Sequence, residues 1–293
     1  MRNTQHETIG TRHAVVTGGS AGIGLETARG LLRRGFERVA IIGRDAGRLA
    51  RAVDSLGPGA VAIRADFSSL AQVEACVQEV KRQLAPLSVV VNNAGVWHAE
   101  RTLSVDGFED TFAVNHLAHF AFTRGLLDHL AERPSLPARI VHVSSRRHVH
   151  CRAMQWDDLM LERRYSGLRA YDQSKLANLL FSAELARRLH GEDRHVRSNA
   201  VHPGSVATEI TRDSGVLSFL SDKVAGLVLL TPAEGAATSI HAATHPALDD
   251  TTGQYFARAR RARPSQAALD ELAGRRLWQL SEKLLRGAGV SDA

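Results

Sequence analysis

Thr17-Gly18-Gly19-Ser20-Ala21-Gly22-Ile23-Gly24 is the most informative segment of the chain. It follows the apolar run His13–Val16, which is typical of a buried strand, and precedes residues 25–32, whose apolar side chains recur at helical spacing. Glycines let backbone N–H groups approach an anion, and the start of a helix adds partial positive charge. The order strand, glycine-rich turn, helix predicts a phosphate-binding loop. Its expected cofactor contacts are Gly18, Ser20, Gly22, Ile23 and Gly24.

The composition favours one globular domain over residues 1–293, because 44% of the residues are hydrophobic and no Pro/Gly/Ser-rich linker or repeat divides them. The net charge of +6 permits acidic partners. The arginines are dispersed, however, and the densest cluster has no interleaved aromatic residues, so we expect a solvated surface and no nucleic-acid partner. That cluster consists of Arg258, Arg260, Arg261 and Arg263.

Cysteine content and hydropathy indicate the cellular compartment. Cys76 and Cys151 are too few for a disulfide framework. Residues 1–12 are polar, and no apolar run approaches the ~20 residues needed to span a bilayer. We therefore expect a cytoplasmic protein without a membrane anchor.

The end of the second predicted strand, residues 38–43, bears on cofactor choice. Folds that prefer NAD usually place Asp or Glu there, ~20 residues past the glycines, to bind the ribose 2′-hydroxyl. This chain has Gly43 followed by Arg44, and arginine can pair with a 2′-phosphate through two hydrogen bonds. We therefore expect NADP(H) to be preferred, with Arg44 as a contact. In the alternative, Arg44 is an exposed loop charge and Asp45 binds the ribose of NAD(H).

Polar residues also follow the next two predicted strands. Asp66-Phe67 follows residues 61–65, at the edge where open α/β sheets bind ligands. Asp66 is a candidate for the adenine amino group or, alternatively, a cap of the helix that starts near Ser68 or Ser69. Asn92-Asn93-Ala94-Gly95 follows residues 87–91, where small residues let the chain pass close to a flat ligand.

Asn115 lies inside a long helical pattern, residues 105–132, although asparagine is a mediocre helix former. One interpretation is a side chain bonded to backbone, which would also kink the helix. The other is an asparagine that holds a water in a proton path. The two are compatible.

A second polar group follows residues 139–143, where Ser144-Ser145 ends a predicted strand. The next helix, from about residue 169 to 190, carries Tyr171 and Lys175 on one face. A nearby ammonium favours the phenolate and lowers the tyrosine pKa, which would make Tyr171 a usable base. By spacing alone, an ordinary surface Tyr–Lys pair is the alternative.

The last third of the chain contains Pro203-Gly204, a turn at the ligand edge of the sheet. Residues 209–230 fit either an amphipathic lid over an apolar substrate or a helix packed on the core or on a second subunit. Residues 264–293 are expected to form a C-terminal helix and tail, with a leucine-rich stripe as packing surface.

Taken together, these motifs resemble the short-chain dehydrogenase/reductase family over almost the whole chain. Within it, the sequence is similar to the retinol-dehydrogenase-like branch, which includes the dehydrogenase part of WW-domain oxidoreductases. The finer resemblance lies in residues 114–120, Ser174-Lys175-Leu176-Ala177-Asn178, Arg275-Arg276-Leu277-Trp278 and the long connection between Ser145 and Tyr171.

The resemblance implies a doubly wound, Rossmann-type α/β fold with a parallel sheet of about seven strands. It also implies a catalytic tetrad of Asn115, Ser145, Tyr171 and Lys175 that interconverts a carbonyl and an alcohol on a small to medium, apolar substrate, and association as a homodimer or homotetramer. Tyr171 is the implied acid or base, and Ser145 binds the carbonyl oxygen. The implied cofactor contacts are Arg44, Asp66, Phe67, Asn93, Ala94, Gly95, Tyr171, Lys175, Pro203, Gly204, Val206 and Thr208.

Three alternatives bear on function. His148, His150 and Cys151 cluster near the expected substrate mouth, but no second ligand pair has metal spacing, so we expect pocket residues and no metal. A dinucleotide-sensing or scaffold protein could keep this fold without turnover. A tailoring ketoreductase could act on a carrier-bound intermediate, with the basic surface docking the carrier.

Overall fold

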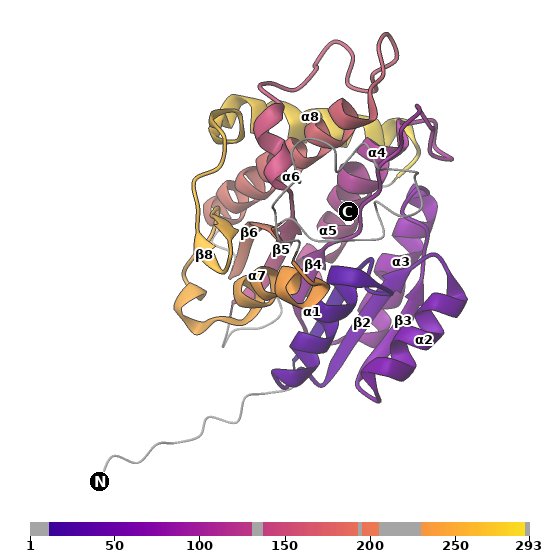
Figure 1. Ribbon diagram of the computed structural model, residues 1–293, viewed down its shortest axis with the longest axis vertical. Coiled ribbons are helices and arrows are strands. Elements are labelled where there is room, and N and C mark those ends of the chain that lie inside the picture. The colour runs from indigo at the N-terminus through magenta and orange to yellow at the C-terminus, as the bar shows by residue number, and fades with distance from the viewer. Residues whose placement is uncertain (1–11, 131–136, 193–194, 205–229, 291–293) are drawn as a thin grey trace.

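The computed structural model describes residues 12–130, 137–192, 195–204 and 230–290, which form an eight-stranded sheet with helices on both faces (Figure 1). Seven strands are mutually parallel, as expected, and a two-residue antiparallel strand extends the edge. In chain order the strands are β1 (His13–Thr17), β2 (Arg38–Gly43), β3 (Ala60–Arg64), β4 (Leu87–Asn92), β5 (Ala138–Val143), β6 (Val196–His202), β7 (Tyr255–Ala257) and β8 (Arg260–Arg261).

The strand order β3-β2-β1-β4-β5-β6-β7-β8 confirms the doubly wound topology. The chain runs from β1 outward to β3 and then returns to pair β4 with the other side of β1. This reversal creates a crevice outside the carboxyl ends of β1 and β4, which is where such sheets bind ligands.

Helices cover both faces of this sheet because its central strands are apolar on both sides. The helices are α1 (Gly22–Arg33), α2 (Ala46–Leu56), α3 (Leu70–Gln83), α4 (Asp110–Phe112), α5 (Ala118–Leu130), α6 (Gly167–Gly191), α7 (Pro232–Thr244) and α8 (Glu271–Gly287). Val15 of β1 faces a core with α3 and α5, whereas Ala14 and Val16 face a second core with α1 and α7.

The predicted helix over residues 105–132 was wrong in its first part. Residues 105–109 form a turn at Gly107, where φ is +82°, and Leu103 bridges Glu109. The Glu109 carboxylate then accepts the N–H groups of Thr111 and Phe112 and starts α4. Asn115 lies in a π-helical segment, Ala113–Leu117, between α4 and α5. The apolar period extends across these breaks, so the pattern alone did not reveal them.

The amphipathic C-terminal segment forms α8, which packs on α6 (Figure 1). Trp278 of α8 contacts the rings of Phe120 on α5 and Phe181 on α6, with centroid distances of 4.9 and 5.9 Å. The expected packing role is therefore confirmed for Leu277 and Trp278, which are buried, whereas Leu269 and Leu272 at the start of the predicted stripe are exposed.

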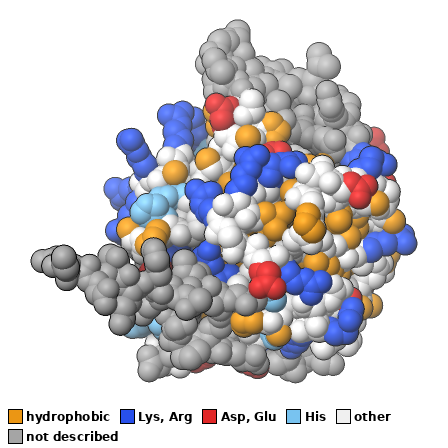
Figure 2. All heavy atoms as spheres, turned by 90° about the horizontal axis from the view of Figure 1, so that it is seen from below, with side chains coloured by type: hydrophobic (Ala, Val, Ile, Leu, Met, Phe, Trp, Pro, Cys, Tyr) orange, Lys and Arg blue, Asp and Glu red, His pale blue; other side chains and the backbone are white. Residues whose placement is uncertain are grey.

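Basic side chains are spread over the face shown in Figure 2, interleaved with hydrophobic and neutral ones. Among the helices that the structure describes, none is both long and apolar enough to cross a membrane.

We predict acid destabilisation from three histidines in the core. Burial lowers the pKa of His116, His119 and His142 to about 3 each, whereas an unfolded histidine titrates near about 6.5. The unfolded chain therefore binds more protons between these values, so stability is full above pH ~6.5 and falls as the pH drops towards ~3. Denaturant titrations should show the free energy of unfolding falling by up to about 1.4 kcal/mol per pH unit for each histidine.

His116→Asn is the matched variant for this test. It should reduce the slope of the free energy of unfolding against pH by about one proton between pH 4 and 6. An unchanged slope would contradict the assignment of this histidine as neutral in the folded state.

Candidate active site

The glycine-rich loop between β1 and α1 has the backbone shape of an anion cradle. Gly18 and Gly22 have φ values of +65° and +54°, which side chains rarely tolerate. The N-cap residue of α1 is Ala21, whose methyl side chain makes no capping hydrogen bond. The backbone N–H groups of the first helical turn are therefore available to a phosphate, and the loop fits a dinucleotide.

The loop after β4 is bonded directly to the glycine-rich loop. The Thr17 hydroxyl oxygen accepts the N–H groups of Asn93 and Ala94 at 2.8 and 2.9 Å. The Asn93 amide donates to the carbonyl oxygens of Thr17 and Gly18 at 2.8 and 3.4 Å. The Asn93 side chain thus fixes the backbone of the glycine-rich loop.

At the end of β2, Arg44 is exposed and its backbone oxygen accepts the guanidinium N–H of Arg64 at 3.1 Å. Asp45 caps α2 instead, because its carboxylate accepts the N–H of Arg48 at 2.8 Å. The Asp45 carboxylate is thus already hydrogen-bonded, whereas the alternative interpretation assigned it to the ribose of NAD(H). Arg64, on the neighbouring strand β3, is a basic residue at this edge that the sequence analysis missed, because strand register is needed to bring it beside Arg44.

Asp66 and Phe67 lie at the carboxyl end of β3. One oxygen of Asp66 accepts the N–H of Ser68 at 3.0 Å, whereas Ser69 caps α3. Asp66 therefore shapes the turn and is only half-buried. The Phe67 ring is buried against His119 and Phe122, so a cofactor contact of this residue would be through its backbone.

The four expected catalytic residues come from three segments and meet above β4 and β5. Lys175 Nζ lies 5.4 Å from the centroid of the Tyr171 ring. A Cβ atom built on Gly95 would lie 3.3 Å from Asn115 Oδ1 and 3.5 Å from Lys175 Nζ. Glycine is thus the residue that fits closely between these two side chains. The Ser145 side chain hydrogen-bonds Tyr171.

Ser144 and Ser145 have different surroundings. Ser144 is buried and its hydroxyl donates to the backbone oxygen of Lys175 at 2.8 Å. Ser145 is half-buried and its oxygen accepts the N–H of Arg147 at 3.3 Å. Ser145 is therefore the more accessible of the two serines, and it is the one whose side chain contacts Tyr171.

The charge state of the Tyr–Lys pair differs from the expectation that Lys175 lowers the pKa of Tyr171. Burial raises the pKa of Tyr171 to about 12, and Asp172 adds to this shift, whereas Ser145 and Arg147 oppose it. Burial also lowers the pKa of Lys175 to about 8. Desolvation wins because both side chains are enclosed. At neutral pH the phenol is protonated and suited to donate a proton.

Asn115 is held from two sides. Its carboxamide accepts the N–H of Val96 at 2.8 Å and donates to the Val96 oxygen at 3.1 Å and to the Ser174 hydroxyl at 3.0 Å. The backbone-bonded interpretation is thus confirmed, with the partner in the loop after β4. Oδ1 keeps a second lone pair, and both Oδ1 and Lys175 Nζ lie beside Gly95.

Sequence reasoning missed an ion pair beside the tetrad. Arg147 Nε and Nη2 donate to the two carboxylate oxygens of Asp172 at 2.6 and 2.9 Å. This bidentate pair ties the connection after β5 to the residue next to Tyr171. The two residues are 25 positions apart, so spacing gave no signal.

The connection after β5 and the loop after β6 complete the edge of the site. His148 is buried and bonded through its two ring nitrogens to the Ser145 oxygen and the Ser265 N–H. Among the residues that the structure describes, no group of three or more His, Cys, Asp or Glu could hold a metal. Pro203 and Gly204 follow β6, with a φ of +92° at Gly204. Val206, Thr208 and the expected lid up to residue 229 lie outside the described residues.

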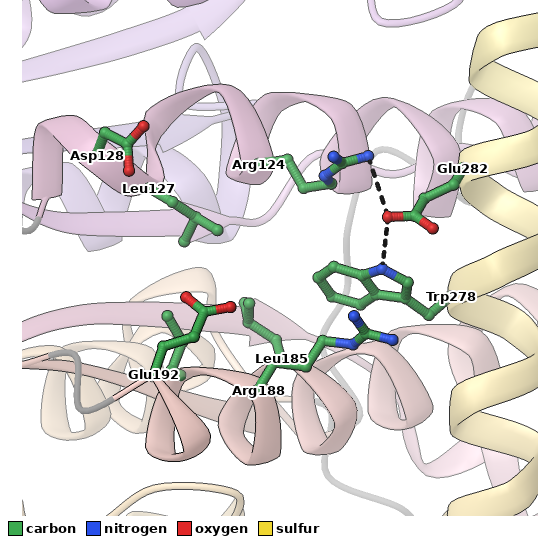
Figure 3. Close-up of a pocket in the computed structure, with 9 residues that line it drawn as sticks. Arg124, Leu127, Asp128, Leu185, Arg188, Glu192, Trp278 and Glu282 are labelled. Atoms are coloured by element: carbon green, nitrogen blue, oxygen red, sulfur yellow. Dashed lines mark hydrogen bonds and ion pairs between the residues drawn. The ribbon is translucent and has the colours of Figure 1, made fainter. Parts of the chain in front are cut away.

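A pocket of about 260 Å³ lies away from the tetrad, between α5, α6 and α8 (Figure 3). Arg188 stacks over Trp278 at 4.2 Å from the ring centroid, and Glu282 accepts the indole N–H at 2.8 Å. Charged side chains line its rim, so it has no resemblance to an apolar substrate site.

Known proteins are similar to this chain in sequence and in fold. The family described as short chain dehydrogenase matches residues 12–215. Human retinol dehydrogenase 12 is 40% identical over 276 residues, which cover 92% of this chain and 85% of that protein. The short-chain dehydrogenase TIC 32 A, chloroplastic, from Brassica napus is 37% identical over 93% of this chain and 88% of its own. Human polyprenol dehydrogenase is 37% identical over 96% and 86%.

Solved structures agree with this relation. An uncharacterised protein from Mycobacterium paratuberculosis superposes with a TM-score of 0.76 at 32% identity, covering 94% of this chain and 93% of that one. The NADP active-site complex of Pseudomonas aeruginosa RhlG has a TM-score of 0.68 at 31% identity, with coverages of 84% and 94%.

The family match and these relatives show an NAD(P)-dependent oxidoreductase, and the chain belongs to the short-chain dehydrogenase/reductase family. Within that family it belongs to the retinol-dehydrogenase-like branch.

We predict that Gly24→Ala damages the cradle. A Cβ atom there would lie 2.2 Å from the Gly18 carbonyl oxygen and 2.5 Å from the Asn93 amide nitrogen, so the loop must move. The NADPH dissociation constant, measured by fluorescence titration, should rise at least ~10-fold, and stability should fall by about 1–3 kcal/mol. Gly191→Ala is the control, because no atom lies within 4 Å of its Cβ position. Equal binding by both variants would contradict the role of the cradle.

Proposed function

We propose that the protein is a cytoplasmic, NADPH-dependent carbonyl reductase of small to medium, apolar molecules, acting through one domain formed by the whole chain. The meeting of Ser145, Tyr171, Lys175 and Asn115 beside the glycine-rich loop carries this proposal. The raised pKa of Tyr171, about 12, supports reduction as the main direction, because the phenol is protonated at neutral pH.

Four residues of the chain carry out the other parts of the proposed reaction. A bound nicotinamide dinucleotide supplies the hydride. Ser145 donates a hydrogen bond to the carbonyl oxygen of the substrate and stabilises the negative charge that develops there. Tyr171 then gives its phenolic proton to that oxygen. The Lys175 ammonium stabilises the resulting phenolate, and Asn115 Oδ1 holds a water through which Lys175 exchanges protons with solvent. Oxidation of an alcohol reverses these steps.

The preference for NADP(H) rests on the charges at the ends of β2 and β3. Arg44 and Arg64 lie side by side and exposed, and Asp45 is engaged as a helix cap. Two guanidinium groups favour a 2′-phosphate, whereas a free carboxylate would repel it. NAD(H) is the weaker alternative cofactor.

An apolar substrate is supported by the relatives, two of which are named for retinol and polyprenol. A carrier-bound intermediate is a second candidate, since an actinorhodin polyketide ketoreductase bound to NADPH superposes at 25% identity with a TM-score of 0.66. Exposed Arg146 and Arg258 near His202 would assist an acidic carrier. The complete tetrad favours turnover over a purely sensing role.

We also propose a homodimer or homotetramer built on α5 and α6. The resemblance to the short-chain dehydrogenase/reductase family supports this arrangement, because association through the helices that carry Asn115 and Tyr171 is the family habit. A twofold axis would place these helices against their copies in the partner.

Tyr171→Phe tests the proton donor. Removal of the phenolic hydroxyl should lower kcat for NADPH-driven carbonyl reduction at least ~100-fold, because general acid catalysis is lost. The NADPH dissociation constant should change little. Tyr165→Phe, whose hydroxyl donates to the His98 oxygen, is the matched control and should retain turnover. Wild-type rates in the Tyr171 variant would overturn the tetrad assignment.

Arg44→Ala tests cofactor choice. Loss of a charge-assisted hydrogen-bonded pair of about 1.5–3 kcal/mol should raise the NADPH dissociation constant ~10- to 100-fold and leave that of NADH nearly unchanged. Arg275→Ala, an equal charge change on α8, should alter neither constant. Equal effects of Arg44→Ala on the two cofactors would refute the proposed preference.

A further inference from the structure

His119 is fully enclosed at the point where the cofactor loops and the tetrad meet. Its Nε2 lies 2.9 Å from the Thr17 hydroxyl oxygen, and its Nδ1 lies 3.1 Å from the backbone oxygen of Asn115. The ring also packs edge-on against Phe67, with centroids 5.4 Å apart. One imidazole thus contacts β1, the π-helical segment and the end of β3.

The partners of His119 determine its tautomer. The Asn115 carbonyl can only accept, so Nδ1 carries the proton and Nε2 is the acceptor. The Thr17 hydroxyl then donates to Nε2 at 2.9 Å, which is a shorter contact than the 3.4 Å to the Val91 oxygen. Its oxygen accepts the N–H groups of Asn93 and Ala94. This arrangement satisfies both ring nitrogens of His119 and the Thr17 hydroxyl together.

We propose that His119 is a positioning residue that couples the cofactor-binding loops to Asn115 of the tetrad. This inference rests on the proposed function. The imidazole orients the Thr17 hydroxyl, whose two accepted amides fix the loop after β4 against the glycine-rich loop. It also fixes the Asn115 backbone, and with it the carboxamide beside Lys175.

The surroundings of His119 keep it neutral, as this role requires. Burial is the main cause of a pKa near 3, and the Lys175 ammonium opposes a second positive charge, although the Asn115 carbonyl favours protonation. The neutral imidazole therefore does not act as an acid or a base in the reaction. It is buried and bonded to Thr17 and Asn115, and its effect passes through these two residues.

Two substitutions of His119 test its two hydrogen bonds separately. We call the bond to the Thr17 hydroxyl the Thr17 arm and the bond to the Asn115 oxygen the Asn115 arm. In His119→Asn, the amide nitrogen can replace Nδ1 as donor to Asn115 but does not reach Thr17. In His119→Gln, the longer side chain can replace Nε2 as acceptor from Thr17 and loses the bond to Asn115. We expect the Asn variant to raise the NADPH dissociation constant about 5- to 10-fold, and the Gln variant to lower kcat about 10-fold with little change in that constant.

Hydrogen exchange of the cofactor-free protein tests the Thr17 arm without turnover. Exchange at the Asn93 and Ala94 amides should be faster in His119→Asn than in the wild type. If the histidine variants fail to fold, Thr17→Val and Thr17→Ser test the same arm. The Val variant should show faster exchange and weaker NADPH binding, and the Ser variant, which keeps the hydroxyl, should restore both.

His129→Gln is the matched control, because His129 is a buried histidine on the same helix that bonds the Leu84 oxygen at 2.9 Å. It should lower thermal stability without moving exchange at Asn93, cofactor affinity or kcat. His119 variants that behave like this control would overturn the inference and leave His119 a structural residue. If the wild type binds NADPH but reduces no carbonyl, the proposed function fails, whereas exchange and affinity still decide the Thr17 arm.

Discussion

The site depends on the pairing of β1 with β4, which brings two chain segments about 75 residues apart to one crevice. The Thr17 hydroxyl joins their ends, because it is buried and bonds both the loop after β4 and an imidazole on α5. A buried hydroxyl left without partners is costly, so these bonds hold the loops in one arrangement. The shape of the dinucleotide cradle follows from that arrangement rather than from the glycines alone.

Burial also sets the chemistry of the tetrad. Tyr171 and Lys175 are enclosed by the same packing that positions them, and desolvation disfavours the charged form of each. A protonated phenol and a lysine with a pKa of about 8 result. Positively charged neighbours favour the phenolate of Tyr171, and desolvation opposes their effect. The phenol is thus protonated at neutral pH, which is the state that the proposed carbonyl reduction requires.

Sequence patterns predicted most of the architecture, because buried parallel strands and their helices leave strong periodic signals. They failed around Asn115, where an apolar period continues through a turn, a short α-helix and a π-helical segment. The difference arises from the Glu109 carboxylate and the Val96 backbone, which impose local bonds that hydrophobic spacing does not encode. The Arg147–Asp172 pair and Arg64 were missed for the same reason, since their partners are distant in the chain.

The sequence by itself determined the fold class and the glycine-rich loop, and it nominated the residues of the proposed tetrad. These depend on residue type and local spacing, which are readable along one strand or one helix. The tertiary structure alone decided how Asp45 is engaged, which tautomer His119 adopts and in which direction burial shifts the pKa values of Tyr171 and Lys175. Those properties arise from desolvation and from hydrogen bonds between distant segments, and both exist only after the chain has folded.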